Sequence, residues 1–243
     1  MNIKSNIINL RNAIPDSCTI VAVSKTNPPE KIKEAYDAGQ RIFGENRVQE
    51  MTPKYEVLPK DIQWHMIGHM QTNKVKYIAP FVHMIHSVDR VGVLEEINKQ
   101  AAKVGRTISC LLQIHIAMED TKFGFSEEEV IELVTGTKIK TLRNVLIEGV
   151  MGMATFTSDK DRVRKEFRGL RHIFDRLKSR RQFPAQLSCC LTDGGVCLSL
   201  YQVAYGLSLC ETKASVGDSS QGEFARVGCP GAEEKERIKN TQE

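Results

Sequence analysis

Short apolar runs alternate with longer amphipathic segments along residues 19–179, and this alternation limits the fold more than any other feature. Segments with helical spacing lie between the runs, and a seventh helix is expected at 160–179. Strands that alternate with helices pair in parallel. Six such units followed by another helix predict an α/β fold, a single-domain (β/α)8 TIM barrel with its functional residues at the C-terminal strand ends. The predicted strands are 19–24, 41–45, 63–68, 84–89, 110–116 and 147–155.

Helix boundary signals support this assignment. Pro28 and Pro29 open an amphipathic segment that Gly39 closes, and proline at the start with glycine at the end is typical of a helix. Ser126 precedes a second such segment, and Glu129 follows three residues later, which predicts a capping box. Both segments are therefore expected to be helices that separate neighbouring strands.

The composition is that of an ordinary globular domain. The chain has 243 residues, 41% hydrophobic and 26% charged, with a formal net charge of +4, and this length can bury one sizeable core. Basic and acidic residues are interleaved, most clearly in 159–181, so we expect a solvated helix face and no nucleic-acid surface. No apolar stretch approaches the roughly 18 residues that cross a bilayer, and residues 1–13 lack the apolar segment of a signal peptide. We therefore expect a cytoplasmic protein that does not bind membranes.

The cysteines and histidines do not predict a metal site. Five of the seven cysteines follow residue 188, and none forms the paired CxxC pattern of a zinc site. His65 and His69 have a spacing that suits a helical metal motif, but they fall across a strand end and the following turn. We therefore expect no metal.

The leading candidate for chemistry is Lys25, which ends the run VAVSK at 21–25. A buried strand that delivers one lysine at its end suits Schiff-base formation, because desolvation lowers the pKa of the amine and a neutral amine attacks an aldehyde. The alternative is a lysine that simply extends to water at a strand end.

Polar residues at other predicted strand ends support a functional rim. In a barrel these positions converge on one mouth. Asn73 and Asp89 are better explained as turn or capping residues, whereas the convergence of the set favours a site. The full set is Lys25, Asn46, Gln71, Asn73, Asp89 and Thr155.

Six ordered blocks resemble the YggS/PROSC family of pyridoxal phosphate homeostasis proteins. The similarity covers about residues 8–188 and rests on VAVSKTNP, FGENRVQE, WHMIGHMQTNK, HSVDR, LLQIHIAMEDTKFGF and GVMGMATF. The resemblance implies a single-domain barrel of the alanine racemase N-terminal type. It also implies that pyridoxal 5′-phosphate (PLP) is held as an internal aldimine on Lys25.

The same resemblance implies further cofactor contacts. Asn46 occupies the position of a family asparagine beside the cofactor ring, where a neutral amide can hydrogen-bond the ring oxygen or orient the aldimine. Gly68 lines the same mouth, with Gln71 and Asn73 as second-tier residues. Met153 either packs against the cofactor or fills the core. Lys74 and Lys122 are conceivable anion sites, although solvated lysines explain both.

The resemblance ends after Ser188, which matches the start of the family's seventh strand. We expect a barrel of seven strands over 1–188 and an aberrant segment over 189–243, with the barrel-closing strand in doubt. The family's phosphate-binding residues lack counterparts there, and Arg226 and Gly228 of FARVG could replace them. A frame shift after Ser188 is our hypothesis for the change. Such a barrel would leave unpaired edges on strands one and seven.

The resemblance implies a monomer that buffers PLP or delivers it to PLP-dependent apoenzymes without strong catalysis. Racemases of the related fold draw a second acid/base residue from a separate domain, for which this chain has no segment. Two alternatives are enzymatic: a PLP-dependent amino acid racemase or lyase, and a cofactor-free aldolase that uses Lys25 directly. The third alternative is a nonfunctional product of the altered tail.

Overall fold

The computed structural model describes residues 3–13, 19–117, 123–155 and 157–179, and the backbone of three strands that follow them. All six predicted strands are confirmed, as are the helices after Pro28, after Ser126 and at 160–179. The helical elements are α1 (Ile3–Ala13), α2 (Pro29–Asp37), α3 (Val48–Val57), η1 (Thr72–Lys74), α4 (Val75–Ile78), α5 (Val91–Lys103), α6 (Glu127–Thr135), η2 (Lys138–Thr141) and α7 (Lys160–Ser179). The strands are β1 (Val21–Val23), β2 (Ile42–Glu45), β3 (Gln63–Met66), β4 (Met84–Val88), β5 (Ile108–Ile114), β6 (Val145–Met153), β7 (Ser188–Asp193), β8 (Val196–Ser199) and β9 (Gly206–Ser208).

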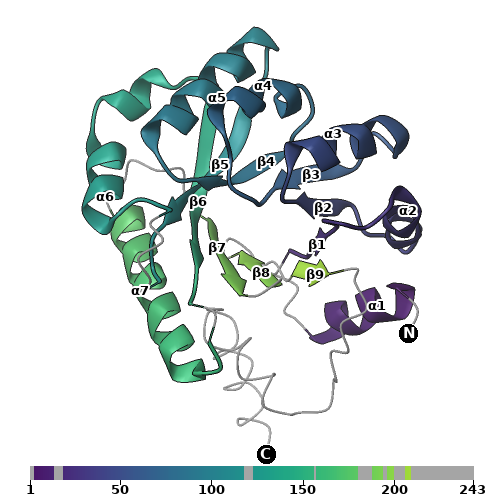
Figure 1. Ribbon diagram of the computed structural model, residues 1–243. Coiled ribbons are helices and arrows are strands. Elements are labelled where there is room, and N and C mark those ends of the chain that lie inside the picture. The colour runs from purple at the N-terminus through teal and green to yellow at the C-terminus, as the bar shows by residue number, and fades with distance from the viewer. Residues whose placement is uncertain are drawn as a thin grey trace, which may run out of the picture.

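The first seven strands form a parallel sheet in which sequence order and spatial order agree. The sheet curls, and helices α2 to α7 follow one another around its outer face (Figure 1). This is the α/β barrel architecture that the strand–helix alternation predicts. Parallel strands end on the same side, so the C-terminal ends of β1 to β6 surround one mouth.

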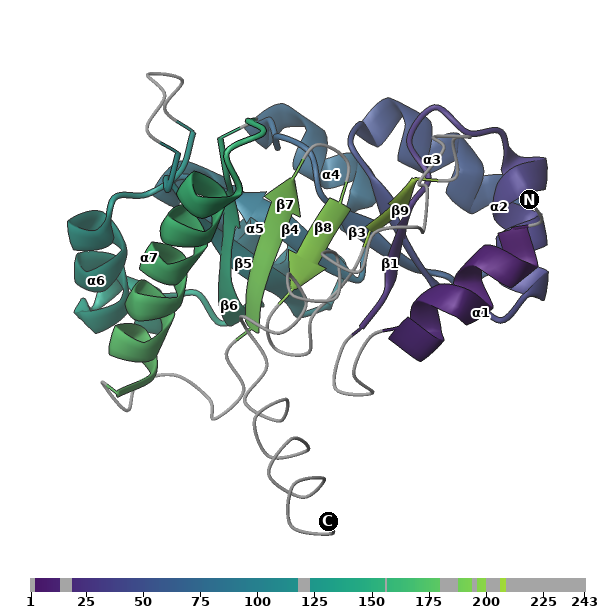
Figure 2. The same ribbon diagram turned by 90° about the horizontal axis from the view of Figure 1, so that it is seen from below.

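The sheet does not end at β1 and β7, so the expectation of unpaired edges on these strands is wrong. β9 adds to β1 in parallel, pairing Ala22 with Leu207. β8 turns back and pairs with β7 in an antiparallel ladder, and it also contacts β9 and β1. Figure 2 shows this side of the barrel, with β7, β8 and β9 between α7 and α1. Segments that depart from the family pattern therefore supply backbone partners to both edges, which satisfies their peptide groups.

The boundary expected at residue 188 falls on the first residue of β7. The strand continues to Asp193, and β8 and β9 follow it. The seventh strand therefore lies almost wholly in the segment that we expected to be aberrant. Its ladder with β6 is regular from Ser188 to Thr192.

Strand alternation sorts side chains between the helix-facing core and the barrel interior. Phe43 and Trp64 point to the helices, where both are fully buried and their ring centroids lie 6.2 Å apart. Met84, Leu111 and Met151 form a separate buried cluster. These three come from neighbouring strands and line the interior. Alternation thus determines which residues at each strand end face the mouth.

Local sequence also determines where the helices begin. At the start of α6, the Glu129 amide donates to Ser126 Oγ at 3.1 Å, and the Ser126 amide donates to Glu129 Oε2 at 2.8 Å. This is the predicted capping box, which stabilises a helix start by about 1 kcal/mol. None of the helices in the described residues is both long enough and apolar enough to span a membrane.

Candidate functional site

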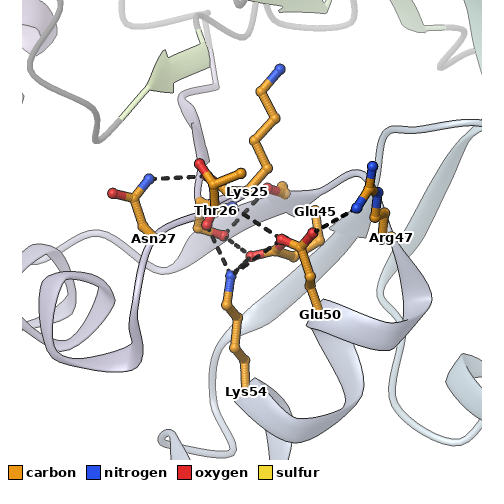
Figure 3. A network of polar contacts seen from close by, with 9 residues as sticks. Lys25, Thr26, Asn27, Glu45, Arg47, Glu50 and Lys54 are labelled. Carbon is orange, nitrogen blue, oxygen red and sulfur yellow. Dashed lines mark hydrogen bonds and ion pairs between the residues drawn. The ribbon is translucent and has the colours of Figure 1, made fainter.

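The end of β1 sends two consecutive side chains in opposite directions. Ser24 is fully buried, and its hydroxyl donates to Glu45 Oε1 at 2.6 Å on the side of α3. Lys25 is half-buried and extends away from that cluster (Figure 3). Strand alternation places Lys25 on the same face as Val23 and Val21, which is the interior face. The predicted lysine therefore lies at the mouth of the barrel.

A tight turn fixes the backbone on both sides of Lys25. The Asn27 amide donates to Ser24 O at 3.1 Å, and Thr26 between them has φ of +62°. Positive φ at the third position is typical of a type II turn, which usually places glycine there. A β-branched residue in this region costs about 1–2 kcal/mol. Other contacts must therefore hold the turn.

Side chains supply those contacts. The Thr26 amide donates to Glu50 Oε2 at 3.0 Å. The Lys25 carbonyl accepts two bonds, from Thr26 Oγ1 at 2.6 Å and from Asn27 Nδ2 at 3.1 Å. The peptide groups next to the lysine are thus bound from α3 and from within the turn, so the starting point of the Lys25 side chain is fixed.

A buried ion pair lies beneath this turn. Lys54 Nζ on α3 donates to Glu45 Oε1 at 2.7 Å and to Ser24 O at 2.9 Å, and it lies 4.0 Å from Glu50 Oε2. The Lys54 side chain is 9% exposed and the Glu45 side chain 0%. Burial raises the pKa of Glu45 from its ordinary value, while hydrogen bonds from Lys54 and Ser24 act in the opposite direction. Glu45 Oε2 has no hydrogen-bond partner among the described residues.

Asn46 and Gly68 meet beside Lys25. Val23 pairs with Gly44, and Lys25 and Asn46 each follow this pair by two residues, just beyond the ends of the neighbouring strands β1 and β2. A Cβ on Gly68 would lie 2.3 Å from Asn46 O and 2.7 Å from its Cα, so only glycine fits. Ser87 Oγ donates to Gly68 O from the next strand. The structure therefore brings three predicted site residues to one part of the rim.

The other predicted residues are more dispersed. Met153 ends β6 on the interior face of Met151 and is 48% exposed, which places it at the mouth. Ser188 pairs with Gly149, whereas Thr192 pairs with Met153. Four residues of strand, about 13 Å, therefore separate Ser188 from the mouth. The role predicted for Ser188 in cofactor binding stays a prediction.

Several second-tier residues lie near η1 or outside the described chain. Gln71 and Asn73 are exposed, and Lys74 is half-buried with Nζ 5.9 Å from the centre of the Tyr77 ring. Arg226, Gly228 and Lys122 lie outside the described residues.

Two strand-end groups bind their own neighbours. Asp89 accepts from His69 Nδ1 at 3.1 Å and from Arg90 at 2.8 Å. The Thr155 amide and hydroxyl each donate to Glu166 of α7 at 2.7 Å. The contacts of Asp89 and Thr155 therefore hold the segments that follow β4 and β6 in place.

A group of three histidines, in which His65 and His86 are buried inside the barrel and His83 is exposed, was not predicted from the sequence. His65 Nδ1 and His86 Nε2 lie 2.9 Å apart, and the His83 ring stacks on His65 with centroids 5.4 Å apart. Burial, together with His86 and His83, holds the pKa of His65 well below its ordinary value. Over the part of the chain that the structure describes, no group of three or more histidine, cysteine or acidic residues could hold a metal ion.

The Glu45–Lys54 pair was not predicted from the sequence either. Its available signal was weak: a glutamate at the end of a strand, followed by Glu50 and Lys54 at the i, i+4 spacing of an ordinary exposed helix pair. Only the packing of α3 against β2 shows that Lys54 is buried.

A family model, "Alanine racemase, N-terminal domain", matches residues 1–206 of the chain. The pyridoxal phosphate homeostasis protein of Aquifex aeolicus is 41% identical over 160 residues, covering 65% of this chain and 69% of the relative. The protein of the same name from Escherichia coli is 33% identical over 183 residues, covering 74% and 77%.

Solved structures agree with these relatives. PipY of Synechococcus elongatus without PLP has a TM-score of 0.69 and 33% identity, covering 74% of this chain and 85% of PipY. The PLP-bound structure of PipY has a TM-score of 0.67 and 32% identity, covering 74% and 84%. An alanine racemase from Clostridium difficile has a TM-score of 0.61 and 17% identity, covering 77% of this chain and 50% of that enzyme, which shows the fold alone.

Proposed function

Because the chain belongs to the alanine racemase N-terminal domain family, and within it to the YggS/PROSC group of pyridoxal phosphate homeostasis proteins, we propose that it binds PLP and buffers or delivers it. PLP is bound covalently on Lys25. The observation that carries the proposal is the half-buried Lys25 side chain, which extends from a fixed turn at the mouth of the barrel, where β1 and the neighbouring β2 end.

The residues at this rim fit the cofactor's reactive end. Lys25 would hold the cofactor through its amine, and PLP would supply an aldehyde there for a reversible covalent bond that forms with loss of one water. The neutral amide of Asn46 suits a ring oxygen, because it adds no charge beside the amine. Gly68 lets the Asn46 backbone come close at this part of the rim, because a Cβ there would lie 2.3 Å from Asn46 O. The bond reverses by hydrolysis, as a protein that stores and releases the cofactor requires.

Binding explains the rim better than catalysis. Asp89 and Thr155, an acidic and a hydroxyl group that follow two of the strands, already bind His69, Arg90 and Glu166. The likeness to alanine racemase concerns the fold and half of that enzyme's length. A racemase or lyase would need a proton-transfer group aimed at a substrate on Lys25.

The proposal also includes where the cofactor goes. A monomer in the cytoplasm would release PLP to PLP-dependent apoenzymes, and the half-buried position of Lys25 leaves the bond open to water and to a competing amine. Arg226 and Gly228 remain predicted phosphate contacts. Gel filtration tests the monomer, and loss of absorbance from the loaded protein on adding an apoenzyme tests delivery.

Borohydride trapping tests the covalent site. Adding PLP should give visible absorbance, and reduction followed by peptide mass spectrometry should locate one pyridoxyl group on Lys25. Lys25→Ala should lose the absorbance and the adduct, whereas Lys33→Ala, which removes an exposed lysine of α2, should keep both. Label spread over surface lysines in the unaltered protein would refute the proposal. Trapping of a carbonyl substrate without PLP would instead favour an aldolase, and interconversion of amino acid enantiomers a racemase.

A further inference from the structure

We propose that Glu45, Glu50 and Lys54 form a clamp that positions Lys25 for bond formation; this inference rests on the proposed function. The clamp consists of the last residue of β2 and two residues of α3. Its members are positioning residues, since they bind the turn that carries the lysine from the side opposite to the Lys25 side chain (Figure 3).

The clamp binds the main chain on both sides of Lys25. Lys54 Nζ donates to Ser24 O at 2.9 Å, immediately before the lysine. Glu50 Oε2 accepts the Thr26 amide at 3.0 Å, immediately after it. The lysine is thus bracketed by two bonds to one helix. A shift or rotation of the turn would break at least one of them.

The turn needs this support because Thr26 has positive φ. At +62° the backbone is in the region that glycine adopts and a β-branched residue avoids. The strain lies one residue after the proposed reactive amine. Observed strain at such a position points to a constraint on function when neighbouring contacts over-determine the conformation.

The buried ion pair of the clamp is not needed for stability alone. Lys54 and Glu45 are almost completely buried, and a buried ion pair is often no more stabilising than an apolar pair of the same size. An apolar pair could not donate to Ser24 O. The ion pair therefore adds a directional contact to the turn, which an apolar contact lacks.

A fixed turn should favour covalent binding of the cofactor. The flexible lysine side chain loses freedom when it joins the aldehyde, and a fixed starting point reduces the volume that it must search. Loosening the turn should weaken PLP binding without removing the reactive amine.

Glu50 offers the sharpest test, because it is partly exposed and its replacement leaves Lys54 paired with Glu45. Glu50→Ala removes the acceptor of the Thr26 amide, whereas Glu50→Gln keeps an acceptor oxygen and removes the charge. Glu96→Ala on α5 is the matched control, since the Glu96 side chain is 24% exposed against 27% for Glu50 and also pairs with a lysine.

The measurements are the dissociation constant for PLP, from visible absorbance, and amide hydrogen exchange at Thr26 in the cofactor-free protein. Glu50→Ala should weaken binding by about tenfold and speed exchange at Thr26 by about as much. Glu50→Gln should stay within about twofold of the unaltered protein in both. The Glu96→Ala control should change neither.

The double variant Glu45→Leu with Lys54→Met separates positioning from stability. An apolar pair should preserve the melting temperature, because Ser24 O keeps the Asn27 amide as a donor, but should weaken PLP binding by about tenfold, because the bond from Lys54 to Ser24 O is lost. Recovery of normal binding together with normal stability would overturn the inference. So would unchanged binding and unchanged exchange in Glu50→Ala.

The two proposals fail in different ways. If the unaltered protein forms no adduct on Lys25, the proposed function fails whatever the variants do. If it forms the adduct and both variants bind PLP normally, the clamp fails and the proposed function stands.

Discussion

Two buried polar clusters lie on neighbouring strands of the barrel, and the charge of their buried groups is treated differently in each. On the helix side of β2, Glu45 and Lys54 pair at 2.7 Å, so opposite charges compensate one another. Inside the barrel, His65 and His86 lie 2.9 Å apart. Burial, together with the neighbouring histidines, lowers the pKa of His65, which stays neutral. The comparison shows that the buried Glu45 has a partner of opposite charge, whereas the buried His65 loses its charge.

The largest expected effect comes from removing one partner of the ion pair. Lys54→Met leaves the Glu45 carboxylate buried and unpaired, which should lower the free energy of unfolding by about 3–5 kcal/mol. Chemical denaturation measures the change. Adding Glu45→Leu should restore most of the loss. If Lys54→Met is as stable as the unaltered protein, Lys54 does not compensate the buried charge of Glu45.

The second prediction tests the close approach between Gly68 and the Asn46 backbone at the rim. Gly68→Ala places a Cβ 2.3 Å from Asn46 O, so β3 or the Asn46 loop must move, at about 1–3 kcal/mol. Thermal melting and PLP binding should both report it. Gly92→Ala on α5 is the control, because its Cβ meets nothing within 4 Å and alanine favours a helix by about 1 kcal/mol. Equal melting temperatures for the two variants would contradict the predicted clash.

The sequence predicted the strands and Lys25 because these depend on local pattern. A run of apolar residues ending in one polar residue carries its own signal, and VAVSK gave both β1 and its lysine. The Glu45–Lys54 pair depends on how α3 packs against β2, and spacing alone suggests an exposed helix pair at Glu50 and Lys54. Tertiary packing, not local pattern, decides which lysine is buried.

The last strands show the same limit. β9 pairs with β1 across most of the chain length, and no local signal specifies a partner so distant in sequence. The register with Gly149 sets the height of the Ser188 backbone in the barrel, whereas the assignment of Ser188 to the cofactor rests on resemblance and stays a prediction. Strand register is fixed by contacts along the whole ladder, which a sequence match at two residues does not contain.

The lowered pKa of His65 predicts that the stability of the protein depends on pH. The folded pKa of His65 lies below its ordinary value of 6.5, so between these two values the unfolded chain binds a proton that the folded protein does not. Stability is therefore full above about pH 6.5 and should fall as the pH is lowered, by about 1.4 kcal/mol per pH unit for this group. Burial lowers the pKa of His83 as well.

Denaturation curves at pH 7.5 and 5.5 measure this loss. His65→Leu should reduce the difference between the two pH values, because one titrating group is removed from the buried cluster. His172→Leu on α7 serves as the control and should keep the slope. An unchanged slope in His65→Leu would show that other groups cause the acid sensitivity.

The smallest expected effect concerns the strain at Thr26, where the two proposals meet. Thr26→Gly removes the penalty of positive φ, about 1–2 kcal/mol, but adds freedom to the unfolded chain, so a net gain of about 0.5–1 kcal/mol is expected. Thermal melting should show a small rise. Because the clamp still holds the glycine amide through Glu50, PLP binding should stay unchanged. Combining Thr26→Gly with Glu50→Ala should recover stability but not binding, since the strain has been relieved while the turn has been freed. Recovery of both would mean that strain relief, rather than positioning, is what the contacts of α3 provide.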